Sequence, residues 1–130
     1  MTRKSILIVD DEPSVGRGLR PILESRQVEV VTALSAREAE ELLDARTFDL
    51  VITDLNLRGR RDRDGLDLIT RIRDAAPDSK VVLFTAYGTA AVRDEALHRG
   101  ARDTWEKSMP IRELIDRVRG LGIPVAAARK

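Results

Sequence analysis

The sequence predicts an α/β domain built on an open, doubly wound, five-stranded parallel sheet. Short apolar runs alternate with segments of helical period along the whole chain, and the connections between them are short. This alternation is typical of parallel strands joined by crossover helices that cover both faces of the sheet. Five such units in 130 residues are too few to close an eight-stranded barrel, so we expect an open sheet.

Five short segments predict the strands. The first, Ser5–Asp10, is a continuous apolar, β-branched run, as expected for a strand buried on both faces. The others are Val28–Ala33, Asp49–Asp54, Lys80–Thr85 and the weaker Asp103–Glu106. None of these runs approaches the length of a bilayer span.

Apolar residues at helical spacing predict the connecting helices. The predicted helices are 13–26, the segment after Ser35, Gly65–Ala76, Thr89–Arg99 and Ile111–Leu121. Ser35 and Glu38 have the spacing of a capping box, and Gly100 stands where a C-terminal cap is favoured. Pro21 lies inside the first helical segment and is expected to kink that helix or to shift its start.

The composition limits the functional classes. Hydrophobic residues make up 42% and charged residues 35%, and Lys+Arg total 23 against Asp+Glu 22, so no electrostatic argument supports a nucleic-acid or membrane surface. Without cysteine, disulfides and thiolate metal sites are impossible. We expect a cytoplasmic protein, with residues 1–122 forming one domain and 123–130 forming a tail or the start of a linker.

Acidic side chains follow two of the predicted strands. Asp10 and Asp11 follow the first strand, and Asp54 ends the third. If the strand order is 2-1-3-4-5, these two strands are neighbours at the topological switch point, where ligands of open α/β sheets bind. Three crowded carboxylates repel one another unless a cation is present, and a set of oxygen ligands favours Mg²⁺ or Mn²⁺.

The same edge of the sheet is predicted to hold the remaining parts of a phosphoryl-transfer site. A carboxylate can attack phosphorus and form an aspartyl phosphate. Thr85 ends the fourth strand and Lys107 follows the fifth. A hydroxyl and an ammonium group placed there can bind the charged phosphoryl oxygens.

Four stretches of the sequence resemble the receiver domain of two-component response regulators. They are ILIVDDEP at 6–13, DLVITDLNL at 49–57, VVLFTAYG at 81–88 and GARDTWEK at 100–107. The resemblance covers almost the whole chain and implies a flavodoxin-like (βα)5 fold. The stretch TAYGT is most similar to receivers of nitrogen-regulator-type transcription factors.

The resemblance also implies roles for individual residues. Asp54 matches the phosphoacceptor, and Asp10 and Asp11 match the acidic pair that holds Mg²⁺. Asn56 matches the position whose backbone carbonyl completes the metal site. The two remaining matches are Thr85, for the switch hydroxyl, and Lys107, for the lysine that pairs with the phosphoryl group.

The implied function is a switch, not a turnover enzyme. A sensor histidine kinase or a phosphotransfer protein donates the phosphoryl group, and the change in charge acts on the face made by the fourth helix, fifth strand and fifth helix. That face is also the expected surface for a homodimer. No direct contact of this domain with nucleic acid or membrane is expected.

The sequence departs from the family pattern near the lysine and after the phosphoacceptor. Ser108 replaces the usual proline after Lys107, so we expect a trans peptide bond there. Thr104 stands where the family has an aromatic residue, and Trp105 is expected to pack under the last helix instead. The longer loop after Asp54 is rich in arginine at 58–63 and is expected to be solvated.

Two other functions remain open. A Mg²⁺-dependent phosphatase with an aspartyl nucleophile uses similar chemistry, but it needs a general acid where this chain has Asn56. A degenerate receiver, acting as a phosphorylation-independent binding module, is compatible with Thr104 and with the altered sequence after Lys107. Phosphorylation of Asp54 distinguishes this module from the switch.

Overall fold

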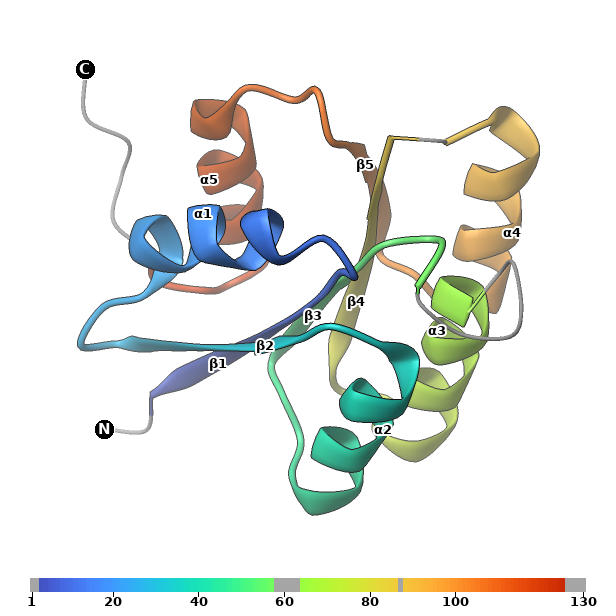
Figure 1. Cartoon of the computed structure of the whole chain (residues 1–130), viewed down its shortest axis with the longest axis horizontal. Coiled ribbons are helices and arrows are strands. Elements are labelled where there is room, and N and C mark those ends of the chain that lie inside the picture. The colour runs from blue at the N-terminus through green and yellow to red at the C-terminus, as the bar shows by residue number, and fades with distance from the viewer. Residues whose placement is uncertain (1–2, 58–63, 87, 126–130) are drawn as a thin grey trace.

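The computed structural model describes residues 3–57, 64–86 and 88–125, in which strands and helices alternate strictly (Figure 1). The elements are β1 (Lys4–Val9), α1 (Pro13–Leu23), β2 (Val28–Ala33), α2 (Ala36–Ala45), β3 (Leu50–Thr53), α3 (Asp64–Ala75), β4 (Lys80–Thr85), α4 (Ala90–Arg99), β5 (Asp103–Glu106) and α5 (Ile111–Gly120). The strands form one parallel sheet in the order β2-β1-β3-β4-β5. The predicted fold class and strand order are therefore confirmed.

The helices cover the two faces of the sheet as two separate layers (Figure 1). Because side chains alternate along a strand, Leu7 and Val9 pack with α2, α3 and α4, whereas Ile6 and Ile8 pack with α1 and α5. All four side chains are almost completely buried. Burial on both faces explains why this strand is a continuous apolar run and not an alternating one.

The helix ends follow local signals. Ser35 accepts a hydrogen bond from the backbone of Glu38 at 3.1 Å, as the predicted capping box requires. The Glu38 carboxylate reaches back as expected, but it accepts from Leu34 N at 2.7 Å, one residue before the N-cap. Gly100 ends α4 with a φ of 115°, in the left-handed region that favours glycine. The first helix starts at Pro13 and continues through Pro21, so its start is not shifted.

Beyond α5, the chain packs back onto the α1 and α5 layer. Ile123 and Val125 are buried in that layer, and Lys80 Nζ donates a hydrogen bond to Leu121 O at 2.7 Å. The boundary predicted at residue 122 stays a prediction, although the packing continues past it, and residues 126–130 lie outside the described part. None of the described helices combines the length and the apolar character that a bilayer span requires.

Candidate functional site

The sheet brings three carboxylates together at its carboxyl edge. Asp10 and Asp54 follow the neighbouring strands β1 and β3, and Asp54 N donates a hydrogen bond to Val9 O at 2.9 Å. One carboxylate oxygen from each of Asp10, Asp11 and Asp54 lies within 4.8 Å of the others. Asp10 is 3% exposed and Asp54 9%, so much of this negative charge is removed from water.

Lys107 lies between two of these carboxylates. Its Nζ is 2.6 Å from Asp10 Oδ2 and 3.1 Å from Asp54 Oδ2. The backbone of Lys107 donates a hydrogen bond to Thr85 O at 3.2 Å, which ties the loop after β5 to the end of β4. The peptide bond to Ser108 is trans, as expected, and Lys107 reaches the acidic cluster with this bond in place.

Burial and charge shift the acid–base properties of two groups. Loss of hydration raises the pKa of Asp10, and the nearby Asp54 carboxylate adds to this; the hydrogen bonds from Lys107 and Glu12 only partly offset the rise. Burial alone lowers the pKa of Lys107, but its hydrogen bonds to Asp10 and Asp54 outweigh burial, so its pKa is raised. Lys107 therefore stays charged and Asp10 holds its charge less readily than a solvated aspartate.

The carboxylate oxygens of the acidic cluster are suitable ligands for a hard divalent cation. Backbone N–H groups fix one oxygen of two carboxylates: Glu12 N donates to Asp10 Oδ1 at 2.9 Å, and Leu55 N donates to Asp54 Oδ1 at 2.7 Å. Asp10 Oδ2 is buried, and Lys107 Nζ, 2.6 Å away, is the charged group that faces it. Carboxylate oxygens without imidazole or thiolate favour Mg²⁺.

Two further predicted site residues are described less fully. Thr85 ends β4 with 2% of its surface exposed, at the same edge of the sheet as the acids. Asn56 follows Asp54 by two positions and is exposed. Tyr87 and the arginine-rich segment 58–63 lie outside the described residues.

Comparison with known proteins identifies the family. The family model described as "Response regulator receiver domain" matches residues 6–119. The chain belongs to the response regulator receiver domain family.

Relatives of this receiver domain are response regulators of two-component systems. It is 37% identical over 118 residues to response regulator protein PilR of Pseudomonas aeruginosa, covering 88% of this chain and 26% of PilR. It is 37% identical over 102 residues to the nitrogen assimilation regulatory protein NtrX of Azorhizobium caulinodans, covering 78% of this chain and 22% of NtrX. The receiver domain thus spans only about a quarter of these longer proteins.

Solved structures show the same fold. A CheY-like receiver domain protein from Methanospirillum hungatei superposes with a TM-score of 0.84 at 27% identity, covering 93% of this chain and 95% of that one. A response regulator described as putative from Chloroflexus aurantiacus gives a TM-score of 0.80 at 29% identity, covering 92% and 98% of the two chains.

The aromatic residue of this receiver domain near the lysine is buried in the core. Trp105 is 2% exposed and lies in the core layer of α1 and α5, and its Nε1 donates to Asp103 Oδ2 at 3.0 Å. It pairs across the sheet with Phe84. The expectation that Trp105 packs under the last helix is confirmed; that it need not replace the aromatic residue missing at Thr104 stays a prediction.

Sequence analysis did not identify Gly65 as part of the site. A Cβ added there would lie 2.0 Å from Asp54 O, and Gly65 N donates a hydrogen bond to Leu55 O at 2.9 Å. The first turn of α3 therefore packs directly on the backbone of the candidate phosphoacceptor. An Asp-Gly pair at a helix start is the only local signal, because the contact itself is tertiary.

Proposed function

We propose that this receiver domain accepts a phosphoryl group on Asp54, from the phosphohistidine of a sensor histidine kinase or a phosphotransfer protein, in a Mg²⁺-dependent reaction. An Asp54 carboxylate oxygen attacks phosphorus, the P–N bond breaks, and its electron pair returns to the imidazole. The imidazole takes up a proton from water, so an aspartyl phosphate and a neutral histidine result. The observation that carries the proposal is the convergence of Lys107, Asp10 and Asp11 on Asp54 at the carboxyl edge of the sheet.

Different residues of the chain have different roles in this reaction. Hydrogen bonds from the backbone orient the Asp10 and Asp54 carboxylates before the donor arrives. Mg²⁺ held by Asp10, Asp11, Asp54 and the Asn56 carbonyl, when bound, would neutralise charge on the phosphoryl oxygens. The Lys107 ammonium, already 3.1 Å from Asp54 Oδ2, then stabilises the phosphorylated state.

The output of the reaction is a change of charge, not a released product. A phosphoryl group on Asp54 would offer new hydrogen-bond acceptors to Thr85 and Lys107. Thr85 is the last residue of β4, and Lys107 directly follows β5. These contacts would shift the conformational equilibrium of the surface formed by α4, β5 and α5. That surface, where Leu97 of α4 is 48% exposed, is the proposed site of homodimer formation.

A degenerate receiver is the second candidate function. Thr104 and Ser108 depart from the family pattern, and both lie beside the residues that would signal phosphorylation. A binding module of this kind would keep the fold and the acidic cluster but would not accept a phosphoryl group.

The deciding experiment is intact-mass analysis after incubation with Mg²⁺ and acetyl phosphate. One added phosphoryl group is expected, absent with EDTA and absent in Asp54→Asn. Asp78→Asn, which alters an exposed aspartate away from the site, serves as the matched control and is expected to be modified like the wild type. No modification of the wild type, with acetyl phosphate or with a phosphorylated kinase domain, would favour the binding module.

A further inference from the structure

β2 is an edge strand, so one side of its backbone has no neighbouring strand. The carbonyls of Gln27 and Ala33 accept hydrogen bonds from residues in and beside β1. Because successive residues of a strand direct their backbone groups to opposite sides, Val28, Val30 and Thr32 present their N–H and C=O groups to the open edge. Exposed groups of this kind can pair with another extended chain.

Side chains cover the backbone of the first two of these residues. Arg20 Nη2 donates to Val30 O at 3.1 Å, and Val30 N donates to Glu24 Oε2 at 3.4 Å. Arg3 Nη2 donates to Val28 O at 3.3 Å, and Val28 also exchanges backbone hydrogen bonds with Ser25. An arginine on the last turn of α1 and the glutamate that caps this helix therefore occupy the places that an added strand would use.

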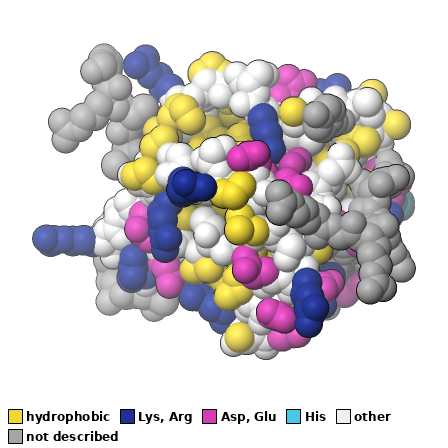
Figure 2. All heavy atoms as spheres, in the orientation of Figure 1, with side chains coloured by type: hydrophobic (Ala, Val, Ile, Leu, Met, Phe, Trp, Pro, Cys, Tyr) yellow, Lys and Arg dark blue, Asp and Glu magenta, His cyan; other side chains and the backbone are white. Residues whose placement is uncertain are grey.

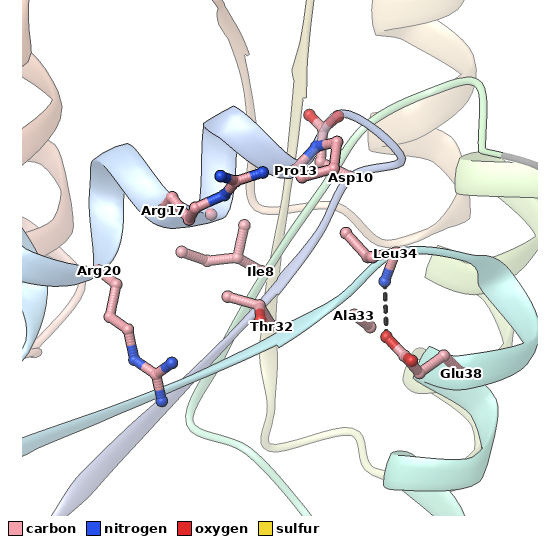
Figure 3. A pocket seen from close by; sticks show the side chains of 10 residues that line it. Ile8, Asp10, Pro13, Arg17, Arg20, Thr32, Ala33, Leu34 and Glu38 are labelled. Atoms are coloured by element: carbon pink, nitrogen blue, oxygen red, sulfur yellow. Dashed lines mark hydrogen bonds between the residues drawn. The ribbon is translucent and has the colours of Figure 1, made fainter.

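Thr32 is left open. Within the described part of the chain, its backbone N–H and C=O have no hydrogen-bond partner. It borders a cavity of about 550 Å³ between α1, the end of β2 and the start of α2 (Figure 3). A Cβ on Gly16 would meet Thr32 Cγ2 at 2.8 Å, so α1 packs directly on this residue and fixes the floor of the cavity.

Four charged side chains line the cavity beside apolar ones, and three of them, Asp10, Arg20 and Glu38, already have partners. Arg17 lines it from α1 and has no ion-pair or hydrogen-bond partner among the residues that the structure describes. Figure 2 shows Lys and Arg side chains on this face interspersed with Asp, Glu and hydrophobic ones. Glu38, on the opposite wall, is already bonded to Leu34 N, and the Leu34 side chain is 45% exposed.

We propose that this cavity docks an extended, acidic segment of a partner protein. One residue of the segment pairs with the backbone N–H and C=O of Thr32, a carboxylate contacts Arg17, and an apolar side chain covers Leu34. Strand addition of this kind takes its affinity from backbone hydrogen bonds and its specificity from the side chains beside them. Since Val30 is covered, pairing is confined to Thr32, which fixes the register of the segment.

The test is a titration of the ¹⁵N-labelled full chain with a terminally blocked Val-Glu-Leu tripeptide, followed by amide chemical shifts. Shifts are expected at Thr32 and Leu34, with Arg17→Ala weakening the apparent affinity about two- to fivefold, the effect of losing one exposed charge pair. Methylation of the backbone nitrogen of the peptide's glutamate is expected to abolish the shifts at Thr32. Arg26→Ala, an exposed arginine that does not line the cavity, is the matched control and is expected to change nothing.

Three results would overturn the proposal. The first is a peptide response that Arg17→Ala leaves unchanged. The second is a set of shifts that maps away from Thr32. The third is the same set of shifts with sodium acetate alone, which would identify a small-anion site and not a site for an extended segment.

Discussion

The Lys107 ammonium group lies 2.6 Å from Asp10 Oδ2, an oxygen buried beside two other carboxylates. Lys107 thereby supplies positive charge to an acidic cluster that would otherwise repel itself. A divalent cation bound by the same carboxylates would compete with Lys107 for Asp10.

Replacement of Lys107 by methionine is expected to lower the free energy of unfolding by about 1–3 kcal/mol in EDTA, because buried carboxylates lose a charged partner. Mg²⁺ is then expected to restore more stability in the variant than it adds to the wild type. Urea unfolding with and without Mg²⁺ measures both effects. Lys4→Met, which removes an exposed ammonium 4.0 Å from Asp49, is the control and is expected to change stability by less than about 1 kcal/mol. An unchanged unfolding midpoint for Lys107→Met would contradict the electrostatic role of this lysine.

The raised pKa of Asp10 predicts a defined pH dependence in the absence of metal. Between the unfolded value of 3.8 and the higher folded one, the native state binds more protons than the unfolded chain. The contribution of Asp10 to stability therefore falls as pH rises through this interval. Asp10→Asn is expected to gain stability relative to the wild type as pH is raised from about 4 to about 7 in EDTA, whereas Mg²⁺, which favours ionised Asp10, is expected to oppose this trend. A difference in urea-unfolding free energy between Asp10→Asn and the wild type that stays flat over this pH range would refute the raised pKa.

Asp11 is expected to affect metal binding and not the fold. It is only partly buried and, within the described residues, makes no hydrogen bond or ion pair. Asp11→Asn should leave the metal-free stability within about 0.5 kcal/mol of the wild type. The Mg²⁺ concentration that raises the melting temperature should increase at least about tenfold, a loss typical of changes around a metal site. A variant that responds to Mg²⁺ like the wild type would remove Asp11 from the ligand set.

Substitution of alanine for glycine at two positions should change the stability in opposite directions. At Gly65 the added methyl group meets Asp54 O at 2.0 Å, so Gly65→Ala is expected to lower stability by about 1–3 kcal/mol or more and to slow phosphorylation. At Gly18, in the middle of α1, nothing lies within 4 Å of the added methyl group, and Gly18→Ala is expected to raise stability by about 0.5–1 kcal/mol. Equal effects in urea unfolding would contradict the close packing of α3 on Asp54.

The sheet and its acidic edge could be predicted because their signals are local. Each strand is a short apolar run, and Asp10, Asp11 and Asp54 stand where these runs end. Helix ends were predicted less well: the first helix was expected over 13–26 but ends at Leu23, because Ser25 and Val28 exchange backbone hydrogen bonds that close a turn.

Contacts that depend on the approach of distant elements could not be predicted. The packing of Gly65 on Asp54 requires α3 to be placed first. The open backbone of Thr32 depends on β2 being an edge strand and on which of its neighbours Arg20 and Glu24 cover. The close approach of Lys107 to Asp10 was also absent from the sequence, which suggested only a lysine directed at the phosphoryl group.

Trp105 is the single tryptophan of the chain, and it lies buried on β5, two residues before Lys107. Its indole is shielded from water among the side chains of α1 and α5, and its N–H is held by Asp103. The protein therefore carries an intrinsic fluorophore with a single, well-defined environment. Its emission should report any rearrangement of β5 against α5 in real time, with no dye attached and no second indole to confuse the signal.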